Sequence, residues 1–524
     1  MFSFNRRDVL LLSAAWFLVV AGLGLRLLLA GHFLLSPDEA NYWQWSRHLA
    51  PCYHDHPPLI AWTIRLATHF LGHSEMAVRL PTILGLTIAG AYLLLLARRA
   101  FSPLCALQVT LLSQGILLLN GAALIATPDG LLLACWAGVC YHAFVALQED
   151  RRASWLVTGV WFGLGLLAKY TMLLVLPSLF LCLLTNRSQR SLLLRPAPWQ
   201  ALGLGLLIFS PVIAWNAGHN WVTFRHVLYQ GGVSEATPFT WKYLLDFLGA
   251  QAALVSPLVF LLLLGAAWRG WRGIPPWVEH QRYLLWMCLP TLLVFCGLAL
   301  RSRVYGNWPA PAYLSALVLI AALYGPGPDS RLGARRLWRW TVLTAWCMTL
   351  PVLGQLLYPL LPLPIRYDRT ARETRGWDEL ARTVHERRQA MERPGETFIF
   401  GLRYQFASEL AFYVPGRPET VSINRWTRPN VYDFWQHDEA LLGKDAVGIF
   451  EGEDMVERVA GLFERAEPAE KIILRRRSPW FGQEEFASYY LFRGYGFKGG
   501  LHWQPRDTGD IRVSRTVAEP DISP

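Results

Sequence analysis

Long apolar stretches separated by short polar loops make up the first 361 residues of the chain. A helix needs about 20 apolar residues to cross the hydrocarbon core of a bilayer, and most of these stretches approach or exceed that length. The pattern predicts eleven membrane-spanning helices, at residues 9–30, 76–97, 103–122, 130–147, 153–168, 172–184, 199–217, 244–268, 283–300, 308–324 and 338–361. Because the first stretch is too long for a signal-peptide core and has no small-residue cleavage site, we expect it to be retained.

The pattern changes after residue 361. Helix-like stretches at 376–391 and 454–466 alternate with strand-like stretches at 397–400, 446–450 and 471–474. Such alternation is typical of a small α/β domain. The sequence therefore predicts a polytopic all-α membrane protein with two domains, a transmembrane domain over residues 1–361 and a C-terminal α/β domain over residues 362–524.

The composition supports a membrane location. Hydrophobic residues make up 53% of the chain and charged residues 17%, whereas a soluble protein is about 25% charged. The 24 Trp residues suit the membrane–water interface, where indole rings accumulate. The net charge of +11 comes largely from short Arg clusters between apolar stretches. This distribution indicates membrane orientation, and we expect no nucleic-acid partner.

The Arg clusters predict the orientation of the helices. If Arg6 and Arg7 are cytoplasmic, every other strong cluster falls on the same side: Arg98/Arg99, Arg151/Arg152, Arg187/Arg190/Arg195, Arg269/Arg272/Arg282 and Arg331/Arg335/Arg336/Arg339. This agrees with the positive-inside rule. The loops 31–75, 123–129, 169–171, 218–243 and 301–307 and the C-terminal domain would then face the opposite side of the membrane, which in the inner membrane of a bacterium would be the periplasm.

Two acidic residues, Asp38 and Glu39, follow the first predicted span. An ionisable pair at a membrane boundary indicates a functional site. However, Ser36 and Glu39 also fit a helix capping box, and Asp38 would complement the helix dipole. Both interpretations stay open. The aromatic residues that follow have spacings suited to a helix lying in the membrane interface: Tyr42, Trp43 and Trp45.

Further acids and histidines occur on the predicted periplasmic side. Asp129 follows Thr127-Pro128 at the start of a predicted span, where it is either a helix cap or part of a site. His54, Asp55 and His56 precede a Pro-Pro pair, which favours an extended backbone. This triplet is either a solvated loop or a ligand-binding one. Asp and His can also bind a divalent metal, but the spacing matches no zinc motif.

Cations are rare in the predicted periplasmic loops, yet Lys169, followed by Tyr170, and Arg301 and Arg303, followed by Tyr305, lie there. Lys169 can be a side chain that extends from the bilayer edge to water, and the Arg pair can be interfacial anchors. Phosphate binding is the alternative, because Arg contacts phosphate through a bidentate fork and Lys through a point charge.

Five motifs occur in order over residues 1–360: Asp38-Glu39, Tyr53-His54-Asp55-His56-Pro57-Pro58-Leu59, Thr127-Pro128-Asp129, Gly165-Leu-Leu-Ala-Lys169-Tyr170-Thr171 and Asn307-Trp308-Pro309-Ala310-Pro311-Ala312-Tyr313. Together they resemble the bacterial members of the protein mannosyltransferase/aminoarabinose transferase group. These are glycosyltransferases of the GT-C fold that use polyprenyl-phosphate sugars. The segments 376–380 and 404–413 are similar to the tail of a bacterial subgroup of family 39 glycosyltransferases.

The resemblance implies roles for the polar residues. Asp38 would be the carboxylate that activates the acceptor, with Glu39 beside it. Asp129 would be the second acid of a sugar- and acceptor-binding site that also includes His54, Asp55 and His56. The lipid phosphate would be bound by Lys169, Tyr170, Arg301, Arg303 and Tyr305. One departure concerns the pair before Pro-Pro, which is Asp55-His56 here and acid–Lys in the aminoarabinose transferases.

The expected function is transfer of a sugar from a polyprenyl phosphate to lipid A, another envelope glycan or protein, with a divalent metal as a compatible cofactor. One alternative is a transporter or flippase of a polyprenyl-linked substrate. Transporters usually have repeated halves and ionisable groups near the bilayer midplane, whereas here the charges gather at one face. The other alternative is a non-enzymatic assembly or sensor protein that binds partners through its C-terminal domain.

Overall fold

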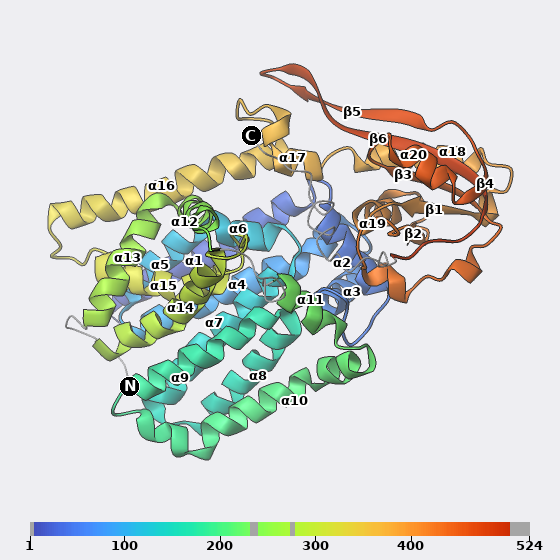
Figure 1. Ribbon diagram of the computed structural model, residues 1–524. Helices are drawn as coiled ribbons and strands as arrows, with labels where there is room; N and C mark the ends of the chain where they lie inside the picture. Colours follow the sequence, from blue (N-terminus) through green and yellow to red (C-terminus); the bar gives the residue numbers. More distant parts are fainter. Residues whose placement is uncertain (1–4, 231–238, 273–277, 504–524) are drawn as a thin grey trace. The chain divides into compact units, whose positions relative to one another are not determined.

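The computed structural model describes residues 5–230, 239–272 and 278–503 (Figure 1). Internal contacts divide the chain into two units. The helical unit comprises Met1–Gly31 and Leu49–Leu353, and the α/β unit comprises His32–His48 and Gly354–Pro524. The predicted cut between residues 361 and 362 lies close to the second boundary. Residues 32–48, however, belong by their contacts to the α/β unit, although they lie in the first predicted periplasmic loop.

The helical unit is built from helices and short 3-10 turns. Its helices are α1 (Arg6–Ala30), α3 (Leu59–Leu71), α4 (Glu75–Ala100), α5 (Pro103–Gln114), α6 (Leu117–Leu124), α7 (Pro128–Glu149), α8 (Arg152–Ala168), α9 (Val175–Thr185), α10 (Pro196–Gly218), α11 (Val222–Gln230), α12 (Trp241–Val255), α13 (Pro257–Arg272), α14 (Val278–Ala299), α15 (Ala310–Tyr324) and α16 (Leu332–Leu357). The 3-10 turns η1 (Tyr170–Leu174) and η2 (Arg190–Leu194) flank α9.

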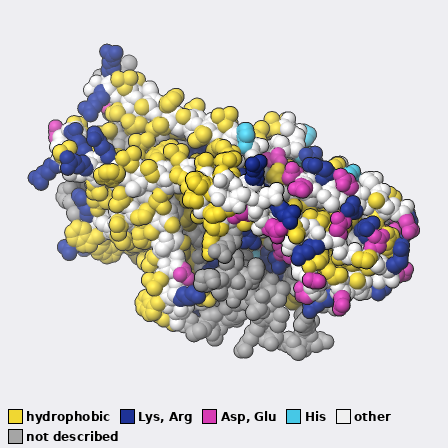
Figure 2. Space-filling model, turned by 90° about the horizontal axis from the view of Figure 1, so that it is seen from above, with side chains coloured by type: hydrophobic (Ala, Val, Ile, Leu, Met, Phe, Trp, Pro, Cys, Tyr) yellow, Lys and Arg dark blue, Asp and Glu magenta, His cyan; other side chains and the backbone are white. Residues whose placement is uncertain are grey.

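The prediction of a multi-pass helical membrane protein is confirmed. Among the described residues, six helices are long and apolar enough to cross a membrane, namely α1, α4, α7, α10, α14 and α16, and the number rises to eight if each of the bent pairs α5–α6 and α12–α13 is one span. The other predicted spans are the shorter apolar helices α8, α9 with η1, and α15. Figure 2 shows a broad hydrophobic surface that suits lipid contact. Exposed apolar side chains of the helical unit include Phe17 and Leu207.

The predicted span over residues 103–122 is broken, because α5 and α6 meet at a bend of 66°. The bend frees backbone carbonyls, which need other donors in an apolar environment. Asn120 Nδ2 donates to the carbonyls of Gln114 (2.9 Å) and Ile116 (3.0 Å). Thr349 Oγ1 donates to the carbonyl of Gly115 (2.7 Å). Side chains therefore compensate for the break.

The predicted span at 244–268 is also broken, with a bend of 108° between α12 and α13. Ser256 at the junction has φ +77°, a conformation that costs energy for a residue with a Cβ atom. Pro257 follows it and has no N–H to continue the hydrogen bonding of α12. The junction therefore ends one helix and starts another in a new direction.

Close packing fixes the start of α7 against α4. A Cβ atom on Gly85 would lie 2.5 Å from the carbonyl oxygen of Gly130, so only glycine permits this approach. Thr82 Oγ1 of α4 also donates to the carbonyl of Ala123 (2.8 Å), just before the loop to α7. Asp129, in the first turn of α7, is therefore held on a rigid support.

The predicted C-terminal α/β domain is confirmed. Its strands are β1 (Thr397–Gly401), β2 (Thr420–Ser422), β3 (Asp445–Phe450), β4 (Phe463–Ala466), β5 (Glu470–Ser478) and β6 (Gly482–Phe497), and its helices include α17 (Arg369–Glu373), α18 (Trp377–Gln389), α19 (Tyr404–Tyr413) and α20 (Met455–Ala460). The strand order is β2-β1-β3-β6-β4, with β5 paired to β6. Strand β1 is parallel to β2 and β3, while β6 is antiparallel to β3, β4 and β5. The predicted domain extends to residue 524, and residues 504–524 lie outside the described residues.

The prediction of a helix over residues 454–466 is only partly right. Helix α20 ends at Ala460, and β4 follows. Phe463 begins β4 and its ring lies 5.5 Å from that of Phe492 in a hydrophobic core. Burial of this aromatic side chain against β6 favours a strand over a longer helix.

Helix α2 (Pro37–Arg47) packs against α19 in the α/β unit. The rings of Trp43 and Phe412 meet edge to face at 4.9 Å, and the backbone N–H of Leu35 donates to the hydroxyl of Tyr413 (2.7 Å). Trp43 and Trp45 are completely buried. The interpretation of this helix as lying in the membrane interface is therefore wrong, because its aromatic face packs against protein.

Candidate functional site

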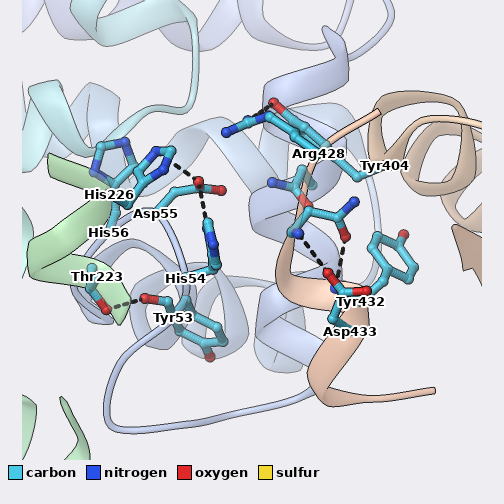
Figure 3. Close-up of polar contacts among 12 residues, drawn as sticks. Tyr53, His54, Asp55, His56, Thr223, His226, Tyr404, Arg428, Tyr432 and Asp433 are labelled. Carbon is cyan, nitrogen blue, oxygen red and sulfur yellow. Dashed lines mark hydrogen bonds and ion pairs between the residues drawn. The ribbon is translucent and has the colours of Figure 1, made fainter. Parts of the chain in front are cut away.

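A histidine pair meets one carboxylate in the helical unit. Asp55 lies in the loop before α3, and its Oδ1 is 3.0 Å from His54 Nδ1 and 3.1 Å from His226 Nε2 (Figure 3). His226 comes from α11, far along the chain. An ionised carboxylate only accepts hydrogen bonds, so His54 Nδ1 donates to Asp55 Oδ1, while His226 Nε2 lies at ion-pair distance from the same oxygen. Asp55 thereby joins its loop to α11.

The same three side chains can hold a metal ion. His54, Asp55 and His226 each offer one ligand atom, and these atoms lie within 4.8 Å of one another. Two imidazole nitrogens and a carboxylate oxygen are suitable donors for Zn²⁺ or a similar divalent ion. The donor set therefore fits a divalent metal. The sequence had allowed a metal at Asp55 and its neighbours without predicting one.

His56 lies next to this group and carries no charge at neutral pH. Burial lowers the pKa of His56 to about 4, and the charge of Lys169 lowers it further, against the opposing effect of Asp55 and Asp129. The influence of these charges shows that His56 is electrostatically connected both to Asp55 and to the acid of α7. It is therefore a neutral group close enough to Asp55, Asp129 and Lys169 for their charges to affect its pKa.

Asp129 and Lys169 form a buried ion pair. Lys169 Nζ lies 2.9 Å from Oδ1 and 3.0 Å from Oδ2 of Asp129, and the side chains are only 4% (Asp129) and 12% (Lys169) exposed. Asn307 Nδ2 donates to Asp129 Oδ2 (3.1 Å), and Thr127 Oγ1 lies 3.4 Å from the same oxygen. Asp129 therefore makes contacts that a simple helix cap does not require.

Seven side chains thus form one acid–histidine cluster in the helical unit: His54, Asp55, His56, Asp129, Lys169, His226 and Asn307. Five of them were predicted from the sequence as site residues. The sequence did not predict the other two as site residues: His226 lies in the predicted loop 218–243, and Asn307 begins the last of the five motifs. No local spacing connects these two residues to Asp55 or Asp129, so only the folded chain reveals them.

Tyr170 supports the loop that carries the cluster. Its hydroxyl lies 3.6 Å from Cys52 Sγ, and Thr223 Oγ1 lies 3.5 Å from the same sulfur. Thr223 also donates to the carbonyl of Tyr53 (2.8 Å). Burial raises the pKa of the Cys52 thiol, so it stays protonated and is a poor nucleophile. These contacts tie α11 to the loop.

The predicted phosphate-binding residues Arg301, Arg303 and Tyr305 lie in the loop between α14 and α15, and their side chains are exposed. Asn307, which reaches Asp129, belongs to the same loop. The loop therefore carries two exposed cations, Arg301 and Arg303, only a few residues before Asn307, which contacts the cluster directly.

Asp38 and Glu39 lie at the start of α2 in the α/β unit. Glu39 is completely buried, and its Oε2 accepts a hydrogen bond from the backbone N–H of Ser36 (2.8 Å). A capping box is present, so the cap interpretation describes Glu39. Asp38, beside it, is exposed. Its catalytic role stays a prediction.

Comparisons with known proteins agree with this architecture. The family model for dolichyl-phosphate-mannose-protein mannosyltransferases matches residues 55–215. A lipid A galacturonosyltransferase, RgtD from Rhizobium johnstonii, is 29% identical over 54% of this chain and 59% of its own length. The undecaprenyl phosphate-alpha-4-amino-4-deoxy-L-arabinose arabinosyl transferase of Pectobacterium carotovorum is 25% identical over 64% of this chain and 63% of its own length. The matched part of this chain thus spans less than two thirds of the length of each of these two relatives.

The fold matches that of a solved membrane-lipid complex. ArnT from Cupriavidus metallidurans bound to undecaprenyl phosphate superposes with a TM-score of 0.64 and 15% identity, covering 94% of this chain and 99% of ArnT. The predicted resemblance to the protein mannosyltransferase/aminoarabinose transferase group is therefore confirmed, and so is the GT-C fold with a C-terminal α/β domain.

Proposed function

We propose that this homologue of the protein mannosyltransferase/aminoarabinose transferase group is a membrane glycosyltransferase that moves a sugar from a polyprenyl-phosphate donor to a hydroxyl of lipid A. One observation carries the proposal. The segment matched by the family model, residues 55–215, contains four members of the acid–histidine cluster: Asp55, His56, Asp129 and Lys169. The part of the chain that resembles the family therefore also carries most of the ionisable residues of the cluster.

The names of the relatives support the donor and the acceptor. RgtD is named for lipid A and for galacturonic acid, and the Pectobacterium transferase is named for an aminoarabinose carried on undecaprenyl phosphate. The two sugars differ, so the proposal is made at the level of a polyprenyl-linked sugar. The orientation proposed here places the N-terminus in the cytoplasm and the cluster and the α/β unit at the periplasmic face, because the Arg clusters then all face the cytoplasm.

The proposed reaction is a single displacement. Asp38 accepts the proton of the acceptor hydroxyl while its oxygen bonds to the anomeric carbon. The bond from that carbon to the phosphate oxygen breaks, and its electron pair leaves with the polyprenyl phosphate. The anomeric configuration inverts. Because phosphate is a good leaving group, no strong general acid is required.

Cations stabilise the departing phosphate in this proposal. An ammonium group has three N–H donors, and the contacts of Lys169 with the two oxygens of Asp129 leave a donor available for a phosphate oxygen. Arg301 and Arg303 add positive charge from the nearby exposed loop. If a divalent ion binds, His54, Asp55 and His226 hold it, and it supplies further positive charge to the phosphate.

Proteoliposomes with a labelled undecaprenyl-phosphate sugar separate this proposal from the flippase alternative. A transferase consumes the donor and releases undecaprenyl phosphate when lipid A is present. A flippase moves intact donor across the bilayer with no need for an acceptor. Intact donor after incubation with lipid A would overturn the proposed function.

The base assignment has its own test. We expect Asp38→Asn to lower kcat by at least about 100-fold, since general-base catalysis contributes about 10² to 10⁴. Asp378→Asn is the matched control, because Asp378 is an exposed acid in the first turn of α18 in the same unit. An Asp38→Asn enzyme with wild-type kcat would remove Asp38 from the mechanism.

A further inference from the structure

The hairpin of β5 and β6 ends in two exposed aromatic side chains. Its turn contains Trp480, which is 57% exposed, and Phe481, which is 46% exposed. Along β5 the outward-facing residues include several cations, at positions that alternate with buried ones: Lys471, Arg475 and Arg477. Large exposed aromatic groups next to a row of cations are unusual on a surface that meets only water.

A second exposed apolar group follows the last candidate membrane span. Helix α16 ends at Leu357. Its 26 residues correspond to about 39 Å, which is enough to cross a hydrocarbon core of about 30 Å. Tyr358, Leu360 and Leu363, which follow directly, are 56%, 50% and 37% exposed. Chain continuity places these residues at the boundary between lipid and water.

The hairpin is fixed to this segment by a buried ionic network within the α/β unit. Arg476 of β5, whose side chain is 4% exposed, lies 2.8 Å from Asp368 and 2.9 Å from Glu484 of β6. Gln355, in the last turn of α16, donates to the same Asp368 oxygen (2.6 Å). The backbone N–H of Ile365 donates to Glu484 Oε1 (2.9 Å). The hairpin therefore keeps a defined position relative to the end of α16.

The aromatic turn itself contacts the same segment. The indole N–H of Trp480 donates to the carbonyl of Leu360 (3.1 Å), three residues after the end of α16. Figure 1 shows the long β5–β6 hairpin projecting beyond the rest of the sheet toward the segment that contains α17. The turn is thus hydrogen-bonded directly to Leu360, a residue at the lipid–water boundary.

We propose that the β5–β6 hairpin is a membrane anchor, with Trp480 and Phe481 inserted into the interfacial layer of an anionic bilayer on the side where α16 ends. Indole rings favour this layer because they combine an apolar body with a polar N–H. Arg475 is already paired with Glu485 of β6 (2.8 Å), so we expect lipid phosphates to meet Lys471 and Arg477, since they attract Lys and Arg near the surface. This inference requires only that α16 spans the membrane, so it stands independently of the proposed transferase activity.

Photocrosslinking in the full-length protein tests the anchor. A benzophenone amino acid would replace Phe481, and the protein would be reconstituted in vesicles of phosphatidylethanolamine and phosphatidylglycerol. Leu442 is the matched control, because it is 52% exposed and neighbours Gly443, whose N–H donates to Phe497 at the opposite end of β6. We expect mass spectrometry to find at least about tenfold more phospholipid adduct from position 481 than from position 442.

The same benzophenone amino acid at Tyr358 makes the absence of lipid adducts at position 481 informative. This residue follows α16 directly, so its adducts report that the protein is properly inserted. Lipid adducts at position 358 without lipid adducts at position 481 would overturn the anchor. Adducts from position 481 to protein alone would also overturn it, and would indicate a protein-binding surface.

The role of charge is tested by Arg477→Gln. A cation near an anionic surface contributes enough free energy for about a fivefold change in occupancy. We therefore expect up to about fivefold less adduct from position 481 in vesicles with phosphatidylglycerol, and no change in vesicles of phosphatidylcholine alone. Equal yields for Arg477→Gln and the parent protein in the anionic vesicles would contradict the electrostatic part of the proposal.

Discussion

Asp129 and Lys169 neutralise each other at a place where water reaches neither side chain well. A Lys169 bonded to both oxygens of one carboxylate has a defined position before any substrate arrives. Such preorganisation is more useful for stabilising a phosphate leaving group than a mobile ammonium, because no reorganisation is needed during the reaction. The pair therefore combines a structural and a proposed catalytic role.

Removal of one partner should show this coupling. We expect Lys169→Met to destabilise the protein by about 3–5 kcal/mol, since it leaves the Asp129 carboxylate buried and unpaired. The double variant Asp129→Asn with Lys169→Met should recover part of that loss. Unfolding temperatures of the purified variants in detergent measure both effects. A double variant less stable than Lys169→Met would show that the two residues act independently.

The histidine pair around Asp55 leads to a prediction about metal. We expect the purified protein to bind about one equivalent of Zn²⁺ per chain, and we expect His54→Gln and His226→Gln each to weaken binding by at least about tenfold. His69→Gln is the control, because His69 is exposed near the end of α3. Calorimetric titration measures the affinity. Equal affinity in all three variants would exclude the histidine pair as ligands.

At the scale of elements, apolar length predicted where helices lie but not where they bend. All eleven predicted spans contain helix, yet two of them are broken pairs. The break at residues 115–116 depends on Asn120 and Thr349, the second of which is more than 200 residues away. The local sequence around residue 115 cannot reveal a hydrogen-bond donor such as Thr349, which only folding brings close. Ser256-Pro257 is different, because Pro257 was a visible signal of the second break.

The bend between α5 and α6 should depend on its side-chain donors. We expect Asn120→Leu to destabilise the protein by about 1–3 kcal/mol, because two backbone carbonyls and the guanidinium of Arg26 lose a buried partner. Thermal unfolding in detergent measures the loss. An unchanged unfolding temperature would show that other groups satisfy the freed carbonyls.

At the scale of the whole molecule, the sequence predicted the fold class and most of the acid–histidine cluster. The lengths of the apolar stretches and the order of the motifs were sufficient, because both are visible along the sequence of the helical part without knowledge of the fold. The sequence did not show that residues 32–48 join the α/β unit, because the contacts of Trp43 with Phe412 and of Leu35 with Tyr413 link positions more than 350 residues apart. Asp38 therefore lies in a different unit from Asp129.

The proposed orientation can be measured on intact cells. A membrane-impermeant maleimide should label Leu442→Cys in the α/β unit from outside, and should label Asp329→Cys between α15 and α16 only after permeabilisation. Both positions are exposed, so access to the reagent decides the result. Labelling of Asp329→Cys in intact cells would reverse the orientation and remove the cluster from the periplasmic face.

The most direct measurement of the proposed function is the mass of lipid A after incubation with the purified protein and an undecaprenyl-phosphate sugar. We predict lipid A heavier by one sugar residue, with one undecaprenyl phosphate released for each sugar transferred, and at least about 100-fold slower product formation by Asp38→Asn. Lipid A of unchanged mass, with each donor sugar of the relatives tested and the wild-type protein folded, would contradict the account.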